Sequence, residues 1–154
     1  MKPIRPGKIE GLPNGFYRVS IKALLLNESR DKFAIILEDN GWWELPGGGL
    51  DWGELPENCL KRELKEEMGL FITEVRRFPS YVLIGENMKG NWTLNLVYEV
   101  KVKDLNYKTS EECQDLRFVS SEELKSIQAF RTVKELGEQF NPEKHLLVHE
   151  VENS

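Results

Sequence analysis

The chain has 154 residues, of which 40% are hydrophobic and 31% are charged, and its formal net charge is −5 at pH 7. This length suits one domain and excludes a tandem of full-size domains, and two cysteines exclude a disulfide-stapled mini-protein. The acidic balance argues against a nucleic acid polymer as partner. No apolar run reaches the roughly 18 residues of a membrane span, and the charged start has no apolar stretch behind it. We therefore expect a cytoplasmic protein without a membrane partner.

The first elements that the pattern predicts are strands. Alternating apolar residues over 16–26 and an apolar run over 32–37 indicate two strands, and the polar residues between them indicate a hairpin. A short extended segment follows at 42–45. The Pro-Gly-Gly-Gly run at 46–49 is then expected to break regular structure.

After Gly53 the pattern becomes helical. Pro56 suits a first helical turn, Gly69 ends the helix, and between them apolar residues recur every four positions, at Leu60, Leu64 and Met68. Later elements are predicted as strands over 81–84, 93–102 and 116–119, a short helix capped by Ser120 or Ser121 through Ile127, and a last helix over 129–140. Strands outnumber helices, which favours an α/β sandwich of sheets with flanking helices.

Acidic residues concentrate in residues 41–70, which hold 7 acidic and 3 basic groups. In the predicted helix, Glu63, Glu66 and Glu67 fall at i, i+3 and i+4, and this spacing brings the three carboxylates onto one face. Three like charges repel one another. Bound Mg²⁺ or Mn²⁺, which take carboxylate and phosphate oxygens, would remove that penalty. The alternative is a solvated acidic face partly paired with Lys61, Arg62 and Lys65.

The residues around these carboxylates decide between the two interpretations. After Gly48 and five further residues comes Glu54, and after seven more comes Arg62-Glu63-Leu64; Glu66-Glu67 and Gly69-Leu70 follow, each after one residue. This spacing resembles the complete signature of the Nudix hydrolases, of the MutT-like kind, from Gly48 to Leu70. The resemblance implies the Nudix fold, an α/β/α sandwich with a mixed central sheet and flanking helices, as a single domain 1–154 with its core at 16–140.

The residue types of this motif suit chemistry on a diphosphate. Glycines at 47–49 allow tight backbone conformations that bring main-chain groups close to metal and phosphate, so Gly48 is expected to be both structural and a substrate contact. Arg62 can orient a neighbouring carboxylate. Glu54, near the start of the helix, is expected to be structural, as is Gly69 at its end.

The resemblance implies hydrolysis of a nucleoside diphosphate derivative, with Mg²⁺ or Mn²⁺ required. By motif position, Glu63, Glu66 and Glu67 would be metal ligands, and the carbonyl of Gly47 would complete a metal site. Glu63 would also be the candidate general base.

Family members often recruit one more acid from a loop beyond the motif. We choose Glu112 for this role, with Glu111 and Asp115 as alternatives, because residues 111–119 resemble that loop and its following strand. The predicted catalytic group is therefore Glu63, Arg62 and Glu112.

The motif itself does not encode the substrate class. Relatives that prefer ADP-ribose carry a proline past the motif, and dinucleoside-polyphosphate hydrolases carry a tyrosine slightly further on, but here Pro79 and Tyr81 come too early. By elimination, the small-molecule substrate is expected to be a nucleoside triphosphate, cleaved to a monophosphate and pyrophosphate. The alternatives are a nucleotide-sugar or ADP-ribose-type diphosphate hydrolase, and a module that binds a nucleotide without turnover.

Candidate substrate contacts also lie outside the motif. Arg18 and Lys22 lie on the polar face of the first strand, where they could meet phosphates or simply be exposed. Aromatic residues beside strand ends often pack in the core, but they can also stack on a base. The candidates of this kind are Trp42, Trp43, Tyr81 and Trp92.

Four other residues indicate no further site. Cys59 and Cys113 are expected to be reduced thiols that fill space. His145 and His149 have helical i, i+4 spacing, but no third ligand accompanies them, so we expect a tail or surface histidines. Nothing in the sequence identifies an interface, and a homodimer stays open.

Overall fold

The structure, a computed structural model, describes residues 15–146. Its centre is a five-stranded mixed sheet in which β1 (Arg18–Leu25) runs parallel to β7 (Trp92–Val102). β4 (Gly47–Gly49) pairs antiparallel with the other edge of β1. β5 (Ile72–Val75) and β6 (Tyr81–Glu86) both pair antiparallel with β7, towards its end and its start respectively.

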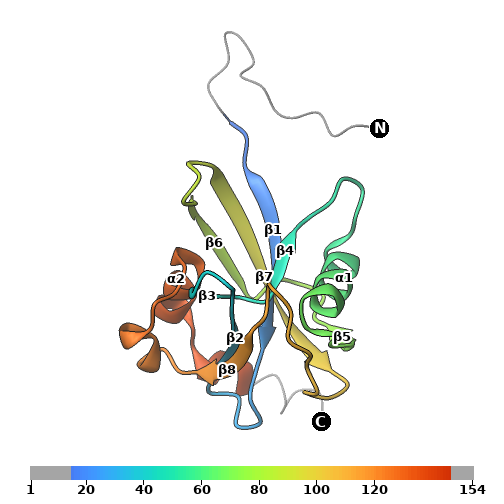
Figure 1. Cartoon of the computed structure of the whole chain (residues 1–154), viewed down its shortest axis with the longest axis vertical. Helices are drawn as coiled ribbons and strands as arrows, with labels where there is room; N and C mark the ends of the chain where they lie inside the picture. Colours follow the sequence, from blue (N-terminus) through green and yellow to red (C-terminus); the bar gives the residue numbers. More distant parts are fainter. Residues whose placement is uncertain (1–14, 147–154) are drawn as a thin grey trace.

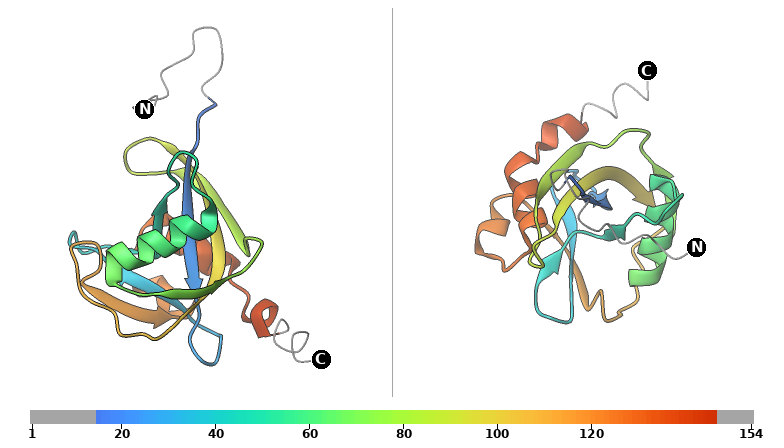
Figure 2. Two further views of the ribbon diagram at one scale, coloured as in Figure 1. Left: turned by 90° about the vertical axis from the view of Figure 1, so that its right-hand side faces the viewer. Right: turned by 90° about the horizontal axis from the view of Figure 1, so that it is seen from above.

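A second, antiparallel sheet has the strand order β3 (Trp43–Glu44), β2 (Phe33–Leu37) and β8 (Asp115–Val119). The helices α1 (Pro56–Met68) and α2 (Arg131–Gln139) lie on opposite sides of the central sheet (Figures 1 and 2). The mixed sheet between helices confirms the predicted fold class. In the described part of the chain, no helix is long and apolar enough to cross a membrane.

The first two strands do not form the predicted hairpin. β1 and β2 belong to different sheets, and only one residue pair, Leu26 and Phe33, bridges them. Both faces of β1 are buried from Ile21 to Leu25, which is the pattern of a central strand. Because β4 and β7 occupy the two edges of β1, the chain continues into the second sheet.

The glycine segment is a strand, so the predicted break was wrong. β4 pairs along its whole length with β1, in the register Gly47–Lys22, Gly48–Ile21 and Gly49–Ser20. Glycine has a weak strand propensity, and here the neighbouring strand compensates for it. The result is a sheet edge whose backbone is not covered by its own side chains.

Helix α1 has the predicted bounds. Pro56 stands in its first turn, and after Met68 the helix ends at Gly69, which is left-handed (φ 66°) and donates its N–H to carbonyls of the last turn. The apolar side packs on the central sheet, which sets the position of the carboxylates relative to β4. The buried apolar residues of α1 are Cys59, Leu60, Leu64 and Met68.

The later elements follow the prediction with two differences. The short predicted helix is a 3₁₀ turn, η1 (Glu123–Ser126); its N-cap position is Glu122 rather than Ser120 or Ser121, but Ser120 forms a reciprocal pair of hydrogen bonds with Glu123. The Glu123 N–H donates to Ser120 Oγ (3.2 Å) and the Ser120 N–H to Glu123 Oε2 (2.8 Å). β5 was not predicted, because its side chains show no buried alternation.

The central sheet separates two hydrophobic cores. The first contains α1 with one face of β1, and the second contains α2 with the opposite face. Cys59 and Cys113 belong to the first core and are free thiols, as predicted. Tyr81 belongs to the second core.

A second group of buried charges surrounds Glu99 of β7, which is 5% exposed and forms ion pairs with Arg30 and Arg76. His145 is 2% exposed, with its Nδ1 3.7 Å from a Glu99 oxygen and its Nε2 2.8 Å from the Tyr81 hydroxyl. Burial lowers the pKa of His145 to about 4, and nearby cations add to this, so the ring is neutral at pH 7. The expected surface position of His145 was wrong. His149 lies outside the described residues.

Candidate active site

The carboxylate of Glu63 lies directly against the glycine strand. A Cβ added at Gly48 would come within 2.6–2.8 Å of the Glu63 carboxyl atoms, so no side chain fits between α1 and β4 at this point. Because α1 is anchored in the first core, this close approach is built into the fold. The Glu63 carboxylate therefore lies directly beside the backbone of β4, with no side chain between them.

The second carboxylate of the motif is bound to the same strand. The Gly47 N–H donates a hydrogen bond to Glu67 Oε1 at 2.8 Å. Gly47 has a φ of +120°, and a Cβ there would lie 2.2 Å from the Ile21 carbonyl oxygen, so only glycine fits. The Gly47 N–H thus holds Glu67, and the carbonyl of the same residue is the one that the family resemblance implies as a metal ligand.

Glu67 is an unusual carboxylate because it is 4% exposed and has no ion pair at 4 Å or less with a described residue. Burial raises its pKa to about 8. Lys22 and the Gly47 N–H oppose this rise, whereas the negative charges of Glu63 and Glu112 add to it. Negative charge at this point is therefore poorly compensated by the protein alone.

Arg62 connects the acids of the motif. Its guanidinium makes two short hydrogen bonds to Glu54 (2.8 and 2.9 Å), one to Glu63 (2.8 Å) and a longer one to Glu66 (3.3 Å). It also donates to the Gly49 carbonyl at 3.3 Å. The Arg62 contact holds the pKa of Glu54 at about 2. Arg62 thus links the start of α1, β4 and two carboxylates.

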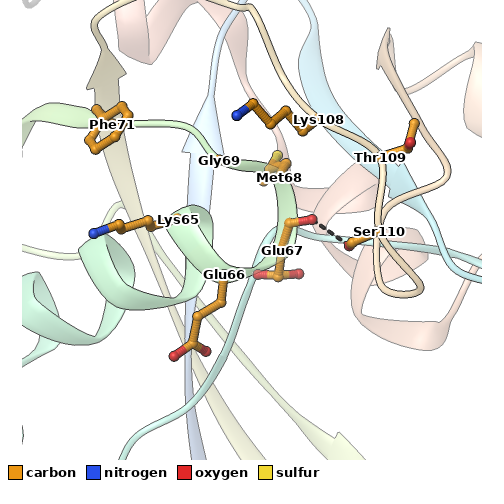
Figure 3. Close-up of a pocket in the computed structure, with 9 residues that line it drawn as sticks. All are labelled: Lys65, Glu66, Glu67, Met68, Gly69, Phe71, Lys108, Thr109 and Ser110. Carbon is orange, nitrogen blue, oxygen red and sulfur yellow. Dashed lines mark hydrogen bonds between the residues drawn. The ribbon is translucent and has the colours of Figure 1, made fainter.

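Glu66 is the most exposed of the three motif carboxylates, with 60% of its side chain accessible. Figure 3 shows its carboxylate pointing in a different direction from that of Glu67. A cavity of about 330 Å³ lies beside both residues, between the last turn of α1 and the segment 108–110. In that segment the Ser110 hydroxyl donates to the Glu67 carbonyl, which fastens the loop to the helix (Figure 3).

The segment that follows this loop brings the charge of Glu112 near the Glu67 carboxylate. The side chain of Glu112 is exposed, and its charge contributes to the raised pKa of both Glu67 and Glu38. The two alternatives are placed differently. Glu111 uses its backbone carbonyl to bind the Asp39 N–H, and Asp115 accepts from the Tyr107 hydroxyl at 3.1 Å. Of the three candidates, Glu112 is the one whose charge acts on Glu67.

Lys22 is buried, at 8% exposure, so the expectation of a simply exposed side chain does not hold for it. Its Nζ lies 3.4 Å from the Leu45 carbonyl and 3.9 Å from Glu44 Oε1. Burial and Glu44 raise the pKa of Glu38 in the same region. Glu38 and Glu44 were missed from the sequence, because their nearness to Lys22 arises only when the second sheet packs beside the first.

The other predicted contacts divide into two groups. The exposed Arg18 guanidinium lies over Gly49, next to the glycine strand. Trp42 packs on Phe130, and Trp43 is covered by the Arg117 guanidinium, so both are engaged within the second-sheet side of the molecule. The two remaining aromatic residues lie elsewhere: Tyr81 is in the second core, and Trp92, 49% exposed, contacts Tyr17.

No three Asp, Glu, His or Cys side chains within residues 15–146 converge on one point in the way a bound metal ion requires. Glu63 and Glu66 are turned towards Arg62, and Glu67 towards Gly47. The donor types nevertheless suit a hard divalent cation, since all three are carboxylates and two of them lie against the backbone of β4. The poorly compensated charge of Glu67 also fits a cation.

Comparisons with known proteins assign this arrangement to a family. The family model described as NUDIX domain matches residues 16–140. The chain belongs to the Nudix hydrolases. This family is a class of pyrophosphohydrolases, and the signature from Gly48 to Leu70 lies inside the matched region.

Several relatives of this Nudix hydrolase have names of their own. It is 40% identical over 92 residues to "Nudix hydrolase 26, chloroplastic" of Arabidopsis thaliana, covering 54% of this chain and 42% of that protein. It is 30% identical over 95 residues to "Nucleoside triphosphatase NudI" of Enterobacter sp. (strain 638), covering 56% and 67%. A "MutT-like protein" of Streptomyces ambofaciens is 43% identical over 54 residues, covering 35% of each chain. The chain thus spans about a third to two thirds of these relatives.

Solved structures show the same fold. The MutT protein from Methanosarcina mazei Go1 has a TM-score of 0.68 at 22% identity, covering 86% of this chain and 99% of that one. The E. coli ORF135 protein has a TM-score of 0.65 at 22% identity, covering 79% and 86%. At this identity the likeness concerns the fold alone.

Proposed function

We propose that this Nudix hydrolase cleaves nucleoside triphosphates to a monophosphate and pyrophosphate, with Mg²⁺ or Mn²⁺ as cofactor. The observation that carries the proposal is the meeting of Glu63 and Glu67 with the backbone of β4, close to the buried Lys22. Carboxylates suit the cation, and a lysine beside a glycine backbone suits phosphate oxygens. The similarity to a nucleoside triphosphatase supports the substrate class.

The proposed cation ligands are Glu63, Glu66, Glu67 and the Gly47 carbonyl. A cation bound there would neutralise phosphate charge and lower the pKa of a bound water. The chain's own residues position these groups: Arg62 holds Glu63 and Glu66, and the Gly47 N–H holds Glu67. A Glu63 oxygen would take a proton from the attacking water as the bond between the α- and β-phosphates breaks.

Residues outside the helix complete the proposed site. Lys22 and Arg18 flank β4 and would bind phosphate oxygens, and Glu112 would supply the acid from the loop. Trp42 and Trp43 would border the nucleoside from the second sheet. We also propose a cytoplasmic location, because nucleoside triphosphates and free thiols such as Cys59 and Cys113 are both found there.

The test is product analysis. The protein is incubated with Mg²⁺ and a panel of canonical and oxidised nucleoside triphosphates, nucleotide-sugars, ADP-ribose and dinucleoside polyphosphates, and the products are separated by chromatography. We expect pyrophosphate and a nucleoside monophosphate from at least one triphosphate, and no turnover in excess EDTA.

The other outcomes each contradict the proposal in a distinct way. Cleavage of nucleotide-sugars or ADP-ribose alone would replace the triphosphate by another diphosphate substrate. Release of orthophosphate would change the bond that is cleaved. Metal-dependent nucleotide binding without turnover on the whole panel would identify a binding module.

A further inference from the structure

Polar side chains continue from the proposed phosphate site along one face of the central sheet. Ile21 faces α1, so Lys22 and Ser20 project from the opposite face of β1, and Ser20 pairs in register with Asn95 of β7. In the other direction along β1, the same face enters the second core at Leu24. Along this face of β1, a nucleotide whose phosphates lie at Lys22 therefore has a polar path towards Ser20 and Asn95.

Asn95 lies within reach of a nucleoside placed in this way. Two residues along a strand span about 7 Å and neighbouring strands are about 5 Å apart, so Asn95 is roughly 8 Å from Lys22 along the sheet. The strands β4, β1, β7 and β6 lie side by side here, with α2 on the same side as this face (Figure 1).

The hydrogen bonds of Asn95 orient its amide. The side chain is 2% exposed, and its Nδ2 donates to the Leu83 carbonyl (3.4 Å) and to Thr93 Oγ1 (3.2 Å). The Thr93 hydroxyl donates its only hydrogen to the Gly85 carbonyl at 3.0 Å, so it must accept from Asn95. Both neighbours thus require the Nδ2 group on their side. The amide oxygen, Oδ1, receives no hydrogen bond from any residue between 15 and 146.

Two arginines flank this amide. The Arg18 guanidinium lies over Gly49, which pairs with Ser20, and the Arg131 guanidinium lies over Gly85, which pairs with Thr93. Arg131 is held there by the Glu86 carbonyl at 3.2 Å. The Arg18 guanidinium itself makes no hydrogen bond or ion pair with any residue between 15 and 146. Planar guanidinium groups stack on flat rings, so the pair suits a nucleobase.

We propose that Asn95 is a specificity-determining residue whose Oδ1 accepts a hydrogen bond from an N–H donor of the nucleobase, which lies between Arg18 and Arg131. The inference rests on the proposed function, which places the phosphates at Lys22. Asn95 Oδ1 is not among the described side-chain atoms that are both shielded from solvent and unbonded, so water reaches this oxygen in the free protein. A base that covers Oδ1 displaces this water, which favours a base that supplies an N–H donor and disfavours one that does not.

The test combines a change in the protein with a change in the base. We would measure kcat/KM for ATP, GTP and purine riboside triphosphate, whose base carries no N–H donor, in the wild type and in Asn95→Leu. For the wild type, kcat/KM with the better of ATP and GTP should exceed kcat/KM with purine riboside triphosphate by about tenfold, which corresponds to one hydrogen bond. Asn95→Leu should lose that preference and leave purine riboside triphosphate within about twofold of the wild-type rate. Asn106→Leu, which alters an exposed loop, should keep the wild-type preference.

A preference that is absent in the wild type, or unchanged in Asn95→Leu, would overturn the inference and leave the proposed function intact. Absence of turnover with every triphosphate would instead contradict the proposed function. In that case, or if Asn95→Leu does not fold, calorimetry on the wild type decides. GMP or AMP should bind about tenfold more tightly than purine riboside monophosphate, and equal affinities would overturn the role of Asn95.

Discussion

The molecule contains two groups of buried acid with opposite charge balance. Glu99 is 5% exposed and contacts Arg30, Arg76 and the His145 ring, so its negative charge is compensated within the protein. Glu67 is equally buried, at 4%, but it has one backbone N–H at 2.8 Å and only a more distant lysine. The negative charges of Glu63 and Glu112 further disfavour its ionised form.

The difference separates an acid whose contacts stabilise the fold from one for which we propose a role in binding a cation. A buried charge is costly unless it is paired, so a fold that has no use for Glu67 would replace or pair it. The carboxylates of Glu63, Glu66 and Glu67, between α1 and β4, instead carry negative charge that a bound ligand can compensate. A divalent cation is the ligand that the oxygen donors favour.

The largest expected effect is on turnover. Glu63→Gln removes the proposed base and a ligand without changing the volume of the side chain, and kcat should fall by about 10²–10⁴-fold. Glu57→Gln, on the exposed first turn of the same helix, should leave kcat within about twofold. Steady-state kinetics on both variants checks this, and near-wild-type turnover of Glu63→Gln would remove Glu63 from the mechanism.

Substitution of Glu99, whose charge is compensated by Arg30 and Arg76, should lower the stability of the fold. Glu99→Gln leaves Arg30 and Arg76 without their shared carboxylate, and the free energy of unfolding should fall by roughly 3 kcal/mol. Urea denaturation measures it. Glu74→Gln, which removes a more exposed partner of Arg76, should cost less than about 1 kcal/mol. Similar losses of unfolding free energy in both variants would contradict the larger stabilising role of the buried Glu99 ion pairs.

Substitution of Glu67, whose charge is poorly compensated, should instead raise the stability of the fold at high pH. The pKa of Glu67 is about 8 when folded and near its usual 4.5 when unfolded, so its ionisation destabilises the metal-free protein progressively as the pH rises from 4.5 to 8. Glu67→Gln cannot ionise, and its amide oxygen can still accept from Gly47. In EDTA it should be more stable than the wild type at pH 9, on the order of 2 kcal/mol, and nearly equal at pH 5. Thermal unfolding at the two pH values tests this, and a variant less stable at both would contradict the charge imbalance.

The smallest effect is expected at the loop acid. Glu112→Gln should lower kcat by about tenfold if Glu112 assists the site, whereas Glu111→Gln, whose contact is through its backbone, should be neutral. Parallel assays with the best triphosphate compare the two. An unchanged rate in Glu112→Gln would move the role to Glu111 or Asp115, or remove it.

The sequence predicted best what is decided locally. The bounds of α1 depend on Pro56 and Gly69, and the alternation of β7 is visible in its own residues. The family signature is equally local, since its spacing is that of one loop and one helix. For this reason the acidic residues of the candidate site can be named from the sequence, and their roles stay a prediction.

What the sequence did not predict depends on contacts between distant segments. β4 is a strand because β1 lies beside it, and β1 is central because it pairs with residues 93–100 of β7. Lys22 and His145 are buried by such contacts, although side chains of these types are more often exposed or only partly buried. The orientation of the Asn95 amide likewise depends on the sheet register, through its hydrogen bond to the Leu83 carbonyl of β6.

The most direct test of the charge imbalance is a cation titration without substrate. Thermal unfolding of the wild type and of Glu67→Gln would be followed at pH 8 with increasing MgCl₂ or MnCl₂, at constant ionic strength. Because a ligand that binds only the folded state raises its stability, the wild-type melting temperature should rise with cation concentration, and that of Glu67→Gln should rise much less. Equal responses of the two proteins, or none in the wild type, would contradict a cation site at α1 and β4.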